Sequence, residues 1–442
     1  MPNTILVFIF PFIMFALVKE LFDNDKTGLL AALLVTTSWS LQSMTRQAHE
    51  AYLAVFVTTL ALLFFVKLTK KFTWKHSFYF LGSLLLALFS YQTSRIFAIY
   101  FFILSCVYFV RLKKGKLFLA SVTAVLILFV ITDVIYKPAR VSNLFFTNTI
   151  GFSMRINEFR GEGGSRLMYN KLVVGAREFL YSYSKYFSPQ FLIISGDENP
   201  RFGNSNLAPI TAMEYLFLFI GLYFLFKNKE RYRYLVGGLL LIAPVPGALS
   251  WAGISLTRTL FFLIPILIIC AYGAIQLQKR APKKYAFYLT MLFIAFELFF
   301  LVFTWDFYFN HYAKRALTVR AWQAGYRELS SYIKDNYSSY DHFYITKKNG
   351  EPYIFLLYYL KYPPAKYQTQ AQLSPPDEYG FGQVEKFDKF TFSLDHISKQ
   401  DKSYVIVGYP DDFNGMSINK RKLKKIKVGT EQIFWIYENK AT

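Results

Sequence analysis

The sequence is poor in cysteine, in acidic residues and in the short motifs of common soluble enzymes. Two cysteines occur in 442 residues, and both Cys106 and Cys270 fall inside apolar runs. This excludes a disulfide framework and predicts two small core residues. Because no Gly-rich nucleotide loop, HExxH or CxxC pair is present, nucleotide hydrolysis and zinc-dependent hydrolysis have no sequence support.

Apolar residues make up 54% of the chain and gather into long runs. Most runs approach the roughly 17–25 residues that cross a bilayer, and the shorter ones fit where a bilayer thins. The pattern predicts an α-helical polytopic membrane protein with about ten transmembrane helices. The predicted spans are Thr4–Phe22, Leu29–Met44, Ala51–Val66, Ser77–Tyr91, Ile96–Val110, Lys116–Tyr136, Ile210–Phe226, Tyr234–Ser250, Leu260–Ile275 and Tyr285–Trp305.

The formal net charge of +22 would point to nucleic acid in a soluble protein. Its distribution excludes that partner here, because basic residues fill every second connection between the apolar runs. This is the positive-inside pattern and predicts that four connections are cytoplasmic. Their basic residues are Lys67, Lys70, Lys71 and Lys75; Arg111, Lys113, Lys114 and Lys116; Lys227, Lys229, Arg231 and Arg233; and Lys279, Arg280, Lys283 and Lys284.

Counting back from the connection at Lys67 places both Met44–Glu50 and residue 1 on the outer face. An outer N-terminus without a signal peptide is topologically awkward. We therefore expect an earlier span, followed by an outer loop, ahead of residue 1. The predicted location is the inner (plasma) membrane, crossed several times.

The hydropathy pattern divides the chain into four parts. Residues 1–136 and 209–305 hold two groups of transmembrane helices, and 137–208 form an extracytoplasmic loop with interfacial helices. After Trp305 the hydropathy falls, and 306–442 are predicted to form a small extracytoplasmic α/β domain. Its expected helices and strands are Ala316–Asn336 and Pro352–Leu360, and His342–Thr346, Tyr404–Gly408 and Gln432–Glu438.

The segment Met44–Glu50 carries three ionisable groups between two apolar runs. Ionisable groups at the edge of a span are costly and tend to be functional. Arg46 and Glu50 are four residues apart, so a continuous helix would place them on one face. An arginine there would grip a phosphate, and a carboxylate would hold a metal, orient an acceptor or act as a base. The plain alternatives are a helix-end ion pair and, for His49, an interfacial side chain.

Two further short outer turns each contain an arginine, Arg95 and Arg258. Snorkelling at a helix end explains any one of them. Together with Arg46 they make three arginines on the predicted outer face, where arginine is disfavoured. Three such residues indicate an anionic ligand, and a lipid phosphate is the obvious candidate. Asp197 and Arg201 lie in the long outer loop and could reach over these turns, although a solvated loop is the alternative.

The sequence motifs of these turns and of the long loop, taken together with the predicted topology, resemble those of glycosyltransferase family 39. These are the dolichyl-phosphate-mannose protein mannosyltransferase-like enzymes of the C-type membrane fold, and the resemblance is to bacterial members especially. Leu88–Arg95 is similar to the family's SxYTYxxxR segment. Gly196–Arg201 is similar to its GDxNxRH loop, with Phe202 replacing the usual histidine. The stretches that complete the resemblance are Gly28–Leu34, Trp39–Glu50, Ala243–Leu249 with Arg258, and Gly350–Phe355.

The resemblance implies inverting transfer of a sugar from a polyprenyl-phosphate-linked donor to a glycan, lipid or protein acceptor at the outer membrane face. It implies a C-type fold lacking its first span, so the principal catalytic carboxylate is expected upstream of residue 1. Glu50 takes a supporting role, and Arg46, Arg95 and Arg258 contact phosphate or acceptor. His49, Asp197 and Arg201 complete the expected substrate site. No cofactor is certain, and a divalent metal ion stays open.

Two other functions remain. A non-enzymatic transporter or flippase of a polyprenyl-linked glycan would use the same arginines to bind lipid phosphate; such proteins often show internal repeats and ionisable groups near mid-span. A scaffold or pseudo-enzyme is the third reading. The sequence shows no clear repeat, and its arginines sit at span ends, which favours the transferase.

Overall fold

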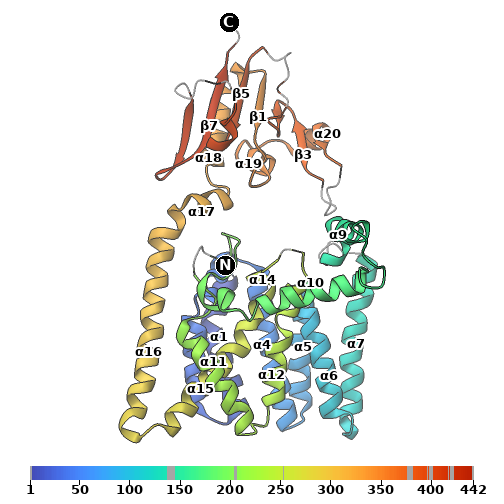
Figure 1. Cartoon of the computed structure of the whole chain (residues 1–442), viewed down its shortest axis with the longest axis vertical. Coiled ribbons are helices and arrows are strands. Elements are labelled where there is room, and N and C mark those ends of the chain that lie inside the picture. Colours follow the sequence, from blue (N-terminus) through green and yellow to red (C-terminus); the bar gives the residue numbers. More distant parts are fainter. Residues whose placement is uncertain are drawn as a thin grey trace. The chain divides into compact units, whose positions relative to one another are not determined.

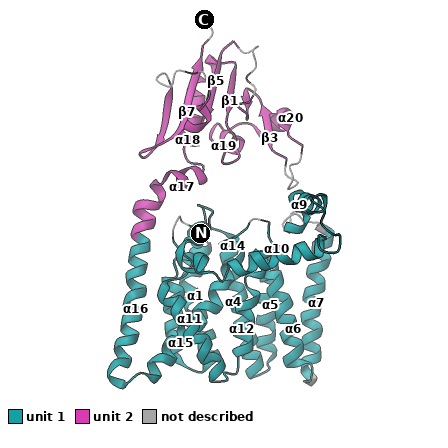
Figure 2. Ribbon diagram, viewed as in Figure 1, with its two compact units in different colours: residues 1–305 teal, residues 306–442 magenta. Residues whose placement is uncertain are grey.

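The computed structural model describes residues 2–136, 145–203, 207–251, 253–375, 382–395, 397, 402–416, 418 and 423–440. The chain divides between Trp305 and Asp306 into two compact units, coloured separately in Figure 2. Unit 1 is helical and unit 2 contains a β-sheet. The division falls where the hydropathy of the sequence drops.

Unit 1 is built almost entirely from helices (Figure 1). They are α1 (Pro2–Phe22), α2 (Asp25–Thr37), α3 (Trp39–Arg46), α4 (Glu50–Lys70), α5 (Trp74–Ser90), α6 (Ser94–Phe109), α7 (Lys113–Tyr136), η1 (Phe146–Asn148), α9 (Ile150–Gly161), α10 (Lys171–Lys185), η2 (Gln190–Ile194), α11 (Ala212–Lys227), α12 (Arg233–Ile242), α13 (Val245–Ala248), α14 (Leu256–Thr259), η3 (Leu260–Phe262), α15 (Leu263–Arg280) and α16 (Lys283–Asp306).

Five helical segments of the described chain are long and apolar enough to cross a membrane. They are Asn3–Phe22, Glu50–Lys70, Lys114–Ile135, Leu256–Arg280 and Lys283–Lys314. The helical membrane character is thus supported by length and composition, and the count of ten spans stays a prediction.

Two predicted spans are interrupted. The run Leu29–Met44 forms α2 and α3, because Ser38 adopts an extended conformation (φ −60°, ψ 106°). The hydroxyl of Thr37 donates to the carbonyl of Leu33 at 3.1 Å, a local bond that competes with regular helix geometry. The run Tyr234–Ser250 ends its first helix before Pro244, which has no N–H to donate.

Burial differs sharply between the helices of unit 1. In the segment Leu256–Arg280, 94% of the most apolar window is buried, against 11% for Lys283–Lys314 and 17% for Lys114–Ile135. The segment Leu256–Arg280 therefore forms the core of unit 1. Helices α16 and α7 lie at its periphery and expose apolar side chains such as Phe299 and Ile135. An apolar periphery of this extent needs a nonaqueous partner, and lipid satisfies it.

Helices α11 and α15 approach each other through two glycines. A Cβ atom on Gly221 would lie 2.1 Å from the carbonyl oxygen of Ile269, and one on Gly273 would lie 2.6 Å from that of Phe217. Small residues at a helix contact let two backbones approach closely, as in membrane helix pairs. This contact fixes α11 against the core helix.

The basic connections gather at one end of unit 1. Arg231 donates to the carbonyl of Thr69 at 3.0 Å, and Lys70 pairs with Glu20 at 2.9 Å. The C-terminal end of α4 therefore lies beside the α1–α2 and α11–α12 connections. Because Glu50 begins α4, the turn at 46–50 lies at the opposite end, which we call the site end. The side of the membrane that each end faces stays a prediction.

A buried polar cluster joins α11 to the peripheral helix α16. The Thr211 hydroxyl donates to Glu297 Oε1 at 2.8 Å and accepts from the backbone N–H of Glu214 at 3.0 Å. The Thr211 N–H in turn donates to Glu214 Oε2 at 2.8 Å. Glu214 and Glu297 are 3% and 2% exposed. One threonine thus serves two carboxyl groups that have little access to water.

We expect Thr211→Val to destabilise unit 1 by about 1–3 kcal/mol, because it removes the hydroxyl partner of a buried carboxyl group. Thermal unfolding of the purified chain in detergent measures the loss. Thr36→Val is the matched control, since Thr36 is exposed and its hydroxyl donates to the carbonyl of Ala32 in its own helix. Equal effects of the two substitutions would contradict the assignment.

Unit 2 contains a mixed sheet of seven described strands in the order β2-β3-β4-β1-β5-β7-β6. Strand β1 runs parallel to β4 and β5, and β5 pairs antiparallel with β7. The elements are η4 (Phe307–His311), η5 (Tyr312–Lys314), α17 (Ala316–Ala321), α18 (Tyr326–Asn336), η6 (Tyr337–Ser339), β1 (His342–Ile345), α19 (Pro352–Tyr359), α20 (Pro364–Gln370), β2 (Gln372–Leu373), β3 (Val384–Phe387), β4 (Phe390–Thr391), β5 (Tyr404–Gly408), η7 (Pro410–Phe413), β6 (Lys424–Val428) and β7 (Glu431–Asn439).

The predicted strands around His342, Tyr404 and Gln432 correspond to β1, β5 and β7. The helical run predicted from Ala316 to Asn336 is divided into α17 and α18. The reason is backbone conformation between them, where Gln323 (φ 55°) and Gly325 (φ 93°) are left-handed and end the right-handed helix.

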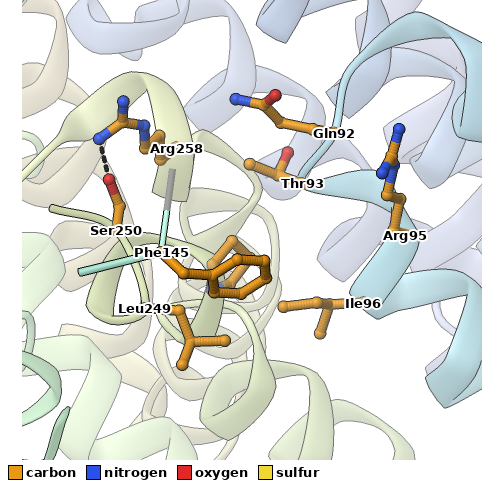
Figure 3. A pocket seen from close by; sticks show the side chains of 9 residues that line it. Gln92, Thr93, Arg95, Ile96, Phe145, Leu249, Ser250 and Arg258 are labelled. Carbon is orange, nitrogen blue, oxygen red and sulfur yellow. Dashed lines mark hydrogen bonds between the residues drawn. The ribbon is translucent and has the colours of Figure 1, made fainter. Parts of the chain in front are cut away.

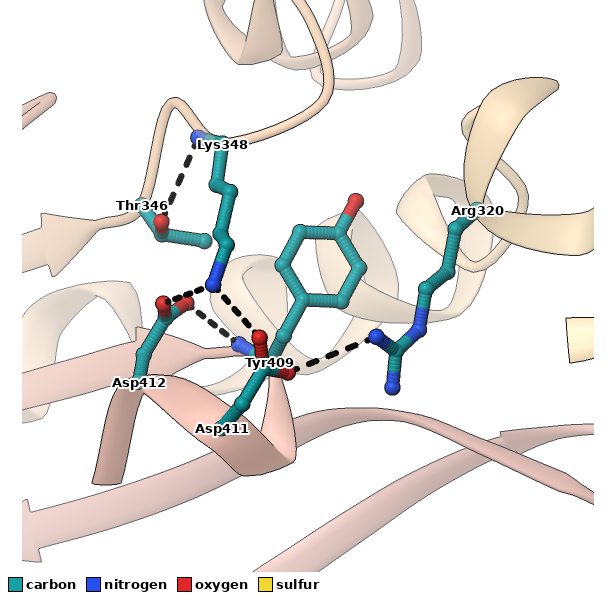
Figure 4. Close-up of polar contacts among 6 residues, drawn as sticks. All are labelled: Arg320, Thr346, Lys348, Tyr409, Asp411 and Asp412. Carbon is teal, nitrogen blue, oxygen red and sulfur yellow. Dashed lines mark hydrogen bonds and ion pairs between the residues drawn. The ribbon is translucent and has the colours of Figure 1, made fainter. Parts of the chain in front are cut away.

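An ion-pair cluster braces one loop of the sheet (Figure 4). Asp411 accepts from Lys348 and, at 3.4 Å, from Arg320, while Asp412 lies 3.3 Å from Lys348. The Lys348 ammonium lowers the pKa of Asp411. The guanidinium of Arg320 also lies 5.4 Å from the Tyr409 ring. Two cations meet two carboxylates, so the charges balance and the cluster acts as a brace between α17, the loop after β1 and η7.

Candidate functional site

The turn at 46–50 joins two helices. Helix α3 ends at Arg46, Ala48 has a positive φ of 52°, and α4 begins at Glu50. The prediction that Arg46 and Glu50 share one helical face is therefore wrong, because the chain reverses between them. Both side chains are exposed, and Arg46 does not line the cavity described below.

His49 is the N-cap of α4. Its Nδ1 accepts a hydrogen bond from the N–H of Ala51 at 3.0 Å. Burial lowers the pKa of His49, and the neighbouring Glu50 carboxylate opposes that shift. A ring nitrogen that accepts carries no proton, so the 3.8 Å approach of Nδ1 to Glu50 is not an ion pair. The imidazole makes edge-to-face contacts with the rings of Tyr91 and Phe202, each with 5.7 Å between ring centroids.

Asp197 holds the 196–203 loop against α14. Its two carboxylate oxygens accept from the N–H groups of Asn199 at 2.8 Å and Leu256 at 2.7 Å. Burial raises the pKa of Asp197, and these two backbone bonds oppose the rise. The loop folds tightly beside it, since a Cβ on Gly203 would meet the carbonyl of Asp197 at 1.5 Å. Asp197 thus positions α14, which contains Arg258.

Asp197→Ala should lower stability by about 1–3 kcal/mol, because it leaves two N–H groups without their acceptor. Chemical or thermal unfolding of the purified chain tests this. The neighbouring Glu198 is exposed, so Glu198→Ala should change stability by no more than about 0.5 kcal/mol. A similar loss of stability in both variants would show that the hydrogen bonds of Asp197 do not hold the 196–203 loop in place.

Two further side chains, of Gln47 and Tyr186, tie the loops of the site end together. The Gln47 side-chain amide donates to the carbonyl of Arg201 at 2.7 Å, which joins the 46–50 turn to the 196–203 loop. The Tyr186 hydroxyl, at the end of α10, accepts from the N–H of Ser255 at 2.9 Å and donates to the carbonyl of Gly253 at 3.3 Å. Arg201 therefore contributes its backbone to the architecture of the site.

Arg258 and Arg95 line one cavity of about 110 Å³ at the site end. Figure 3 shows them on opposite sides, with Gln92 and Thr93 between them and an apolar floor beneath. Arg258 donates to the hydroxyl of Ser250. The floor is formed by Ile96, Phe145, Pro246 and Leu249.

Arg95 is already paired with a carboxylate that sequence reasoning missed. Its guanidinium donates to the two oxygens of Asp133 at 2.9 and 3.4 Å and lies 4.8 Å from the Phe129 ring. Within the described residues the buried Nε of Arg95 has no hydrogen-bond partner. The available signal was an acidic residue near the end of the apolar run Lys116–Tyr136.

Tyr91 links the three turns. Its ring meets His49, and its hydroxyl interacts with Thr257 and lies within the electrostatic reach of Arg258 and Glu50. The structure therefore brings His49, Glu50, Asp197 and Arg258 close to one another. Arg95 belongs to the same region because it lines the same cavity as Arg258. Arg46 is not one of the residues that line this cavity.

The chemistry available to this arrangement is anion binding beside an apolar wall. Two guanidinium groups favour phosphate or carboxylate, and the floor favours an apolar substituent. Among the described residues no group of three or more His, Cys, Asp or Glu side chains is arranged to hold a metal ion. Comparison with protein-family models and with curated proteins found no match.

Proposed function

We propose that this chain is a membrane glycosyltransferase that uses a polyprenyl-phosphate-linked sugar at the outer face of the inner (plasma) membrane. The observation that carries the proposal is the cavity that Arg95 and Arg258 line from opposite sides, above an apolar floor. A lipid phosphate has the matching parts, namely an anionic group attached to an apolar chain. Sugar transfer is proposed because the sequence motifs resemble those of a C-type glycosyltransferase family.

The size of the cavity limits what it holds. Its volume of about 110 Å³ is well below the roughly 300–1,000 Å³ of pockets that enclose a drug-sized ligand. We therefore assign it to the phosphate and the first carbons of the lipid. The sugar would lie toward the 46–50 turn, where Glu50 is exposed, and the rest of the lipid chain would follow the outer helices into the bilayer.

In this mechanism the arginines stabilise the charge that develops on the departing lipid phosphate, as preorganised donors do. Glu50 supports the acceptor hydroxyl as it attacks the anomeric carbon from the opposite face. The principal base is unassigned among the residues of this chain. The acceptor is a glycan, a lipid or a protein.

Asp133 competes with the lipid phosphate for Arg95. Asp133→Asn should tighten binding of a polyprenyl monophosphate about tenfold, since it removes the competing carboxylate, whereas Arg258→Ala should weaken binding roughly 10- to 100-fold. Titration of the purified chain in nanodiscs measures both. Arg111→Ala, at an exposed arginine of the α6–α7 connection, is the control and should leave the affinity unchanged.

If Asp133→Asn weakens binding, Arg95 needs its carboxylate for position, and the competition model is wrong. If Arg258→Ala and Arg111→Ala reduce affinity equally, the lipid responds to overall charge and the cavity is not its site. Thermal unfolding of each variant separates a binding defect from a folding defect.

Transfer itself depends on Glu50 in this proposal. Glu50→Gln should reduce sugar transfer from a labelled polyprenyl-phosphate sugar by about 10- to 100-fold, less than the roughly 10²–10⁴-fold of a general acid or base. The loss is smaller because Glu50 has a supporting role, and lipid binding should change little. Glu162→Gln, an exposed glutamate of the α9 end, is the matched control. Transfer that is insensitive to Glu50→Gln would remove the supporting role.

A specific observation also favours the transporter as the second candidate. Glu214 and Glu297 are buried on two apolar helices, and ionisable groups inside membrane helices often mark transport pathways. Vesicles that contain the purified chain distinguish the two functions. A transferase moves the labelled sugar onto an acceptor, whereas a flippase moves the lipid across the vesicle wall with its sugar attached.

A further inference from the structure

Unit 2 has a concave aromatic surface on α19 and α20, two elements labelled in Figure 1. We call this surface the tyrosine groove. It has a volume of about 330 Å³ and is exposed, with Tyr358 at 75% and Ile354 at 50% accessibility. It is lined by Ile354, Leu357, Tyr358, Tyr362, Pro364 and Tyr367.

The groove is a built feature with a packed base. Tyr362 and Tyr367 each meet the buried Phe387 of β3 edge-on at 5.3 Å. Tyr353 stacks on Tyr367 at 6.1 Å, and the Tyr362 hydroxyl donates to Gln370 at 2.7 Å. The rings of Tyr362 and Tyr367 are thus held in place before any partner binds, so ordering these two side chains costs little on binding.

The segment that forms the groove carries positive charge, and the nearest carboxylate comes from outside it, where Asp388 of the β3–β4 turn interacts with Tyr362. From Pro352 to Pro375 the chain contains Lys361 and Lys366 and no acidic residue. The ammonium of Lys366 lies 5.3 Å from the ring of Tyr362, which places this cation at the groove. Lys361 follows α19 directly and is exposed. The complementary partner is therefore anionic and presents some apolar surface.

The chain itself brings such a partner within reach. Helix α16, the apolar segment that could cross a membrane, ends at Asp306, the first residue of unit 2. A unit tethered to a membrane segment meets the bilayer surface at high effective concentration. Tyrosine side chains favour the headgroup level because one end of the ring is apolar and the other polar, and lysines nearby add attraction to anionic lipids.

We propose that the tyrosine groove, with Lys361 and Lys366, binds the headgroup layer of an anionic bilayer and so docks unit 2 on the membrane. This docking goes beyond the proposed transferase function and does not rest on it. The tyrosine rings insert at the headgroup level, and the two ammonium groups meet lipid phosphates. The docking weakens as ionic strength rises, because the lysines are exposed to solvent.

The test uses the full chain in nanodiscs of zwitterionic lipid, with and without anionic lipid. A fluorescent label is attached in a Cys106→Ser background at Tyr358→Cys, and nitroxide-bearing lipids serve as quenchers; Cys270 is fully buried and escapes labelling. The reference label is at Lys427→Cys, on the exposed edge strand β6. We expect strong quenching at 358 in anionic discs, weaker quenching in zwitterionic discs and little at 427.

Lys361→Gln with Lys366→Gln should lower the docked-to-free ratio about thirtyfold, from roughly a factor of five for each basic residue at an anionic surface. Hydrogen exchange of the segment 352–370 in unlabelled protein repeats the measurement with Tyr358 intact, and it should be slower in anionic discs than in zwitterionic ones. Equal quenching at 358 and 427, or exchange that is indifferent to lipid charge, overturns the proposal. Protection of the groove by added oligosaccharide in place of lipid also overturns it, in favour of a glycan site.

Discussion

The hydrogen bond that the backbone N–H of Leu256 donates to the Asp197 carboxylate fixes the geometry of the site end. It sets the start of α14, two residues before Arg258, while the other carboxylate oxygen shapes the 196–203 loop. Gln47 then ties that loop to the turn that begins α4. Segments far apart in sequence are thus held together at the site end by hydrogen bonds between side chains and backbone groups. Arg258 is therefore held at the cavity by the fold itself, whereas the second arginine, Arg95, is held by its ion pair with Asp133.

Much of the fold was predictable because apolar length and β-strand pattern are local signals. The helices of unit 1, the change at Trp305 and three strands of unit 2 could be located from them. The interruption at Ser38 and the left-handed residues Ala48 and Gln323 could not, since tertiary packing selects those conformations. This is why Arg46 and Glu50 were placed on one helical face when the chain in fact turns between them.

The candidate site was predictable in its parts and less so in its pairing. The charge pattern marked Arg95 and Arg258 as members of one set, and the structure places both at one cavity. It did not reveal that Asp133 pairs with Arg95, because an ion pair between two helices has no spacing rule in sequence. In the same way, Thr211 donates to Glu297, which lies 86 positions away in the sequence, and the packing of α16 beside the start of α11 brings them together.

The contact of α11 with α15 through Gly221 and Gly273 also bears on how this molecule can move. A carbonyl oxygen of the facing helix occupies the place of a side chain at each glycine, so the two backbones are in direct contact and their separation has little room to change. Carriers that alternate their access rock one rigid group of helices against another. We therefore expect any such seam to run elsewhere than between α11 and α15. The sparsely buried helix α7 is the better candidate, because α16 is tied to the α11 end by the buried bond from Thr211 to Glu297.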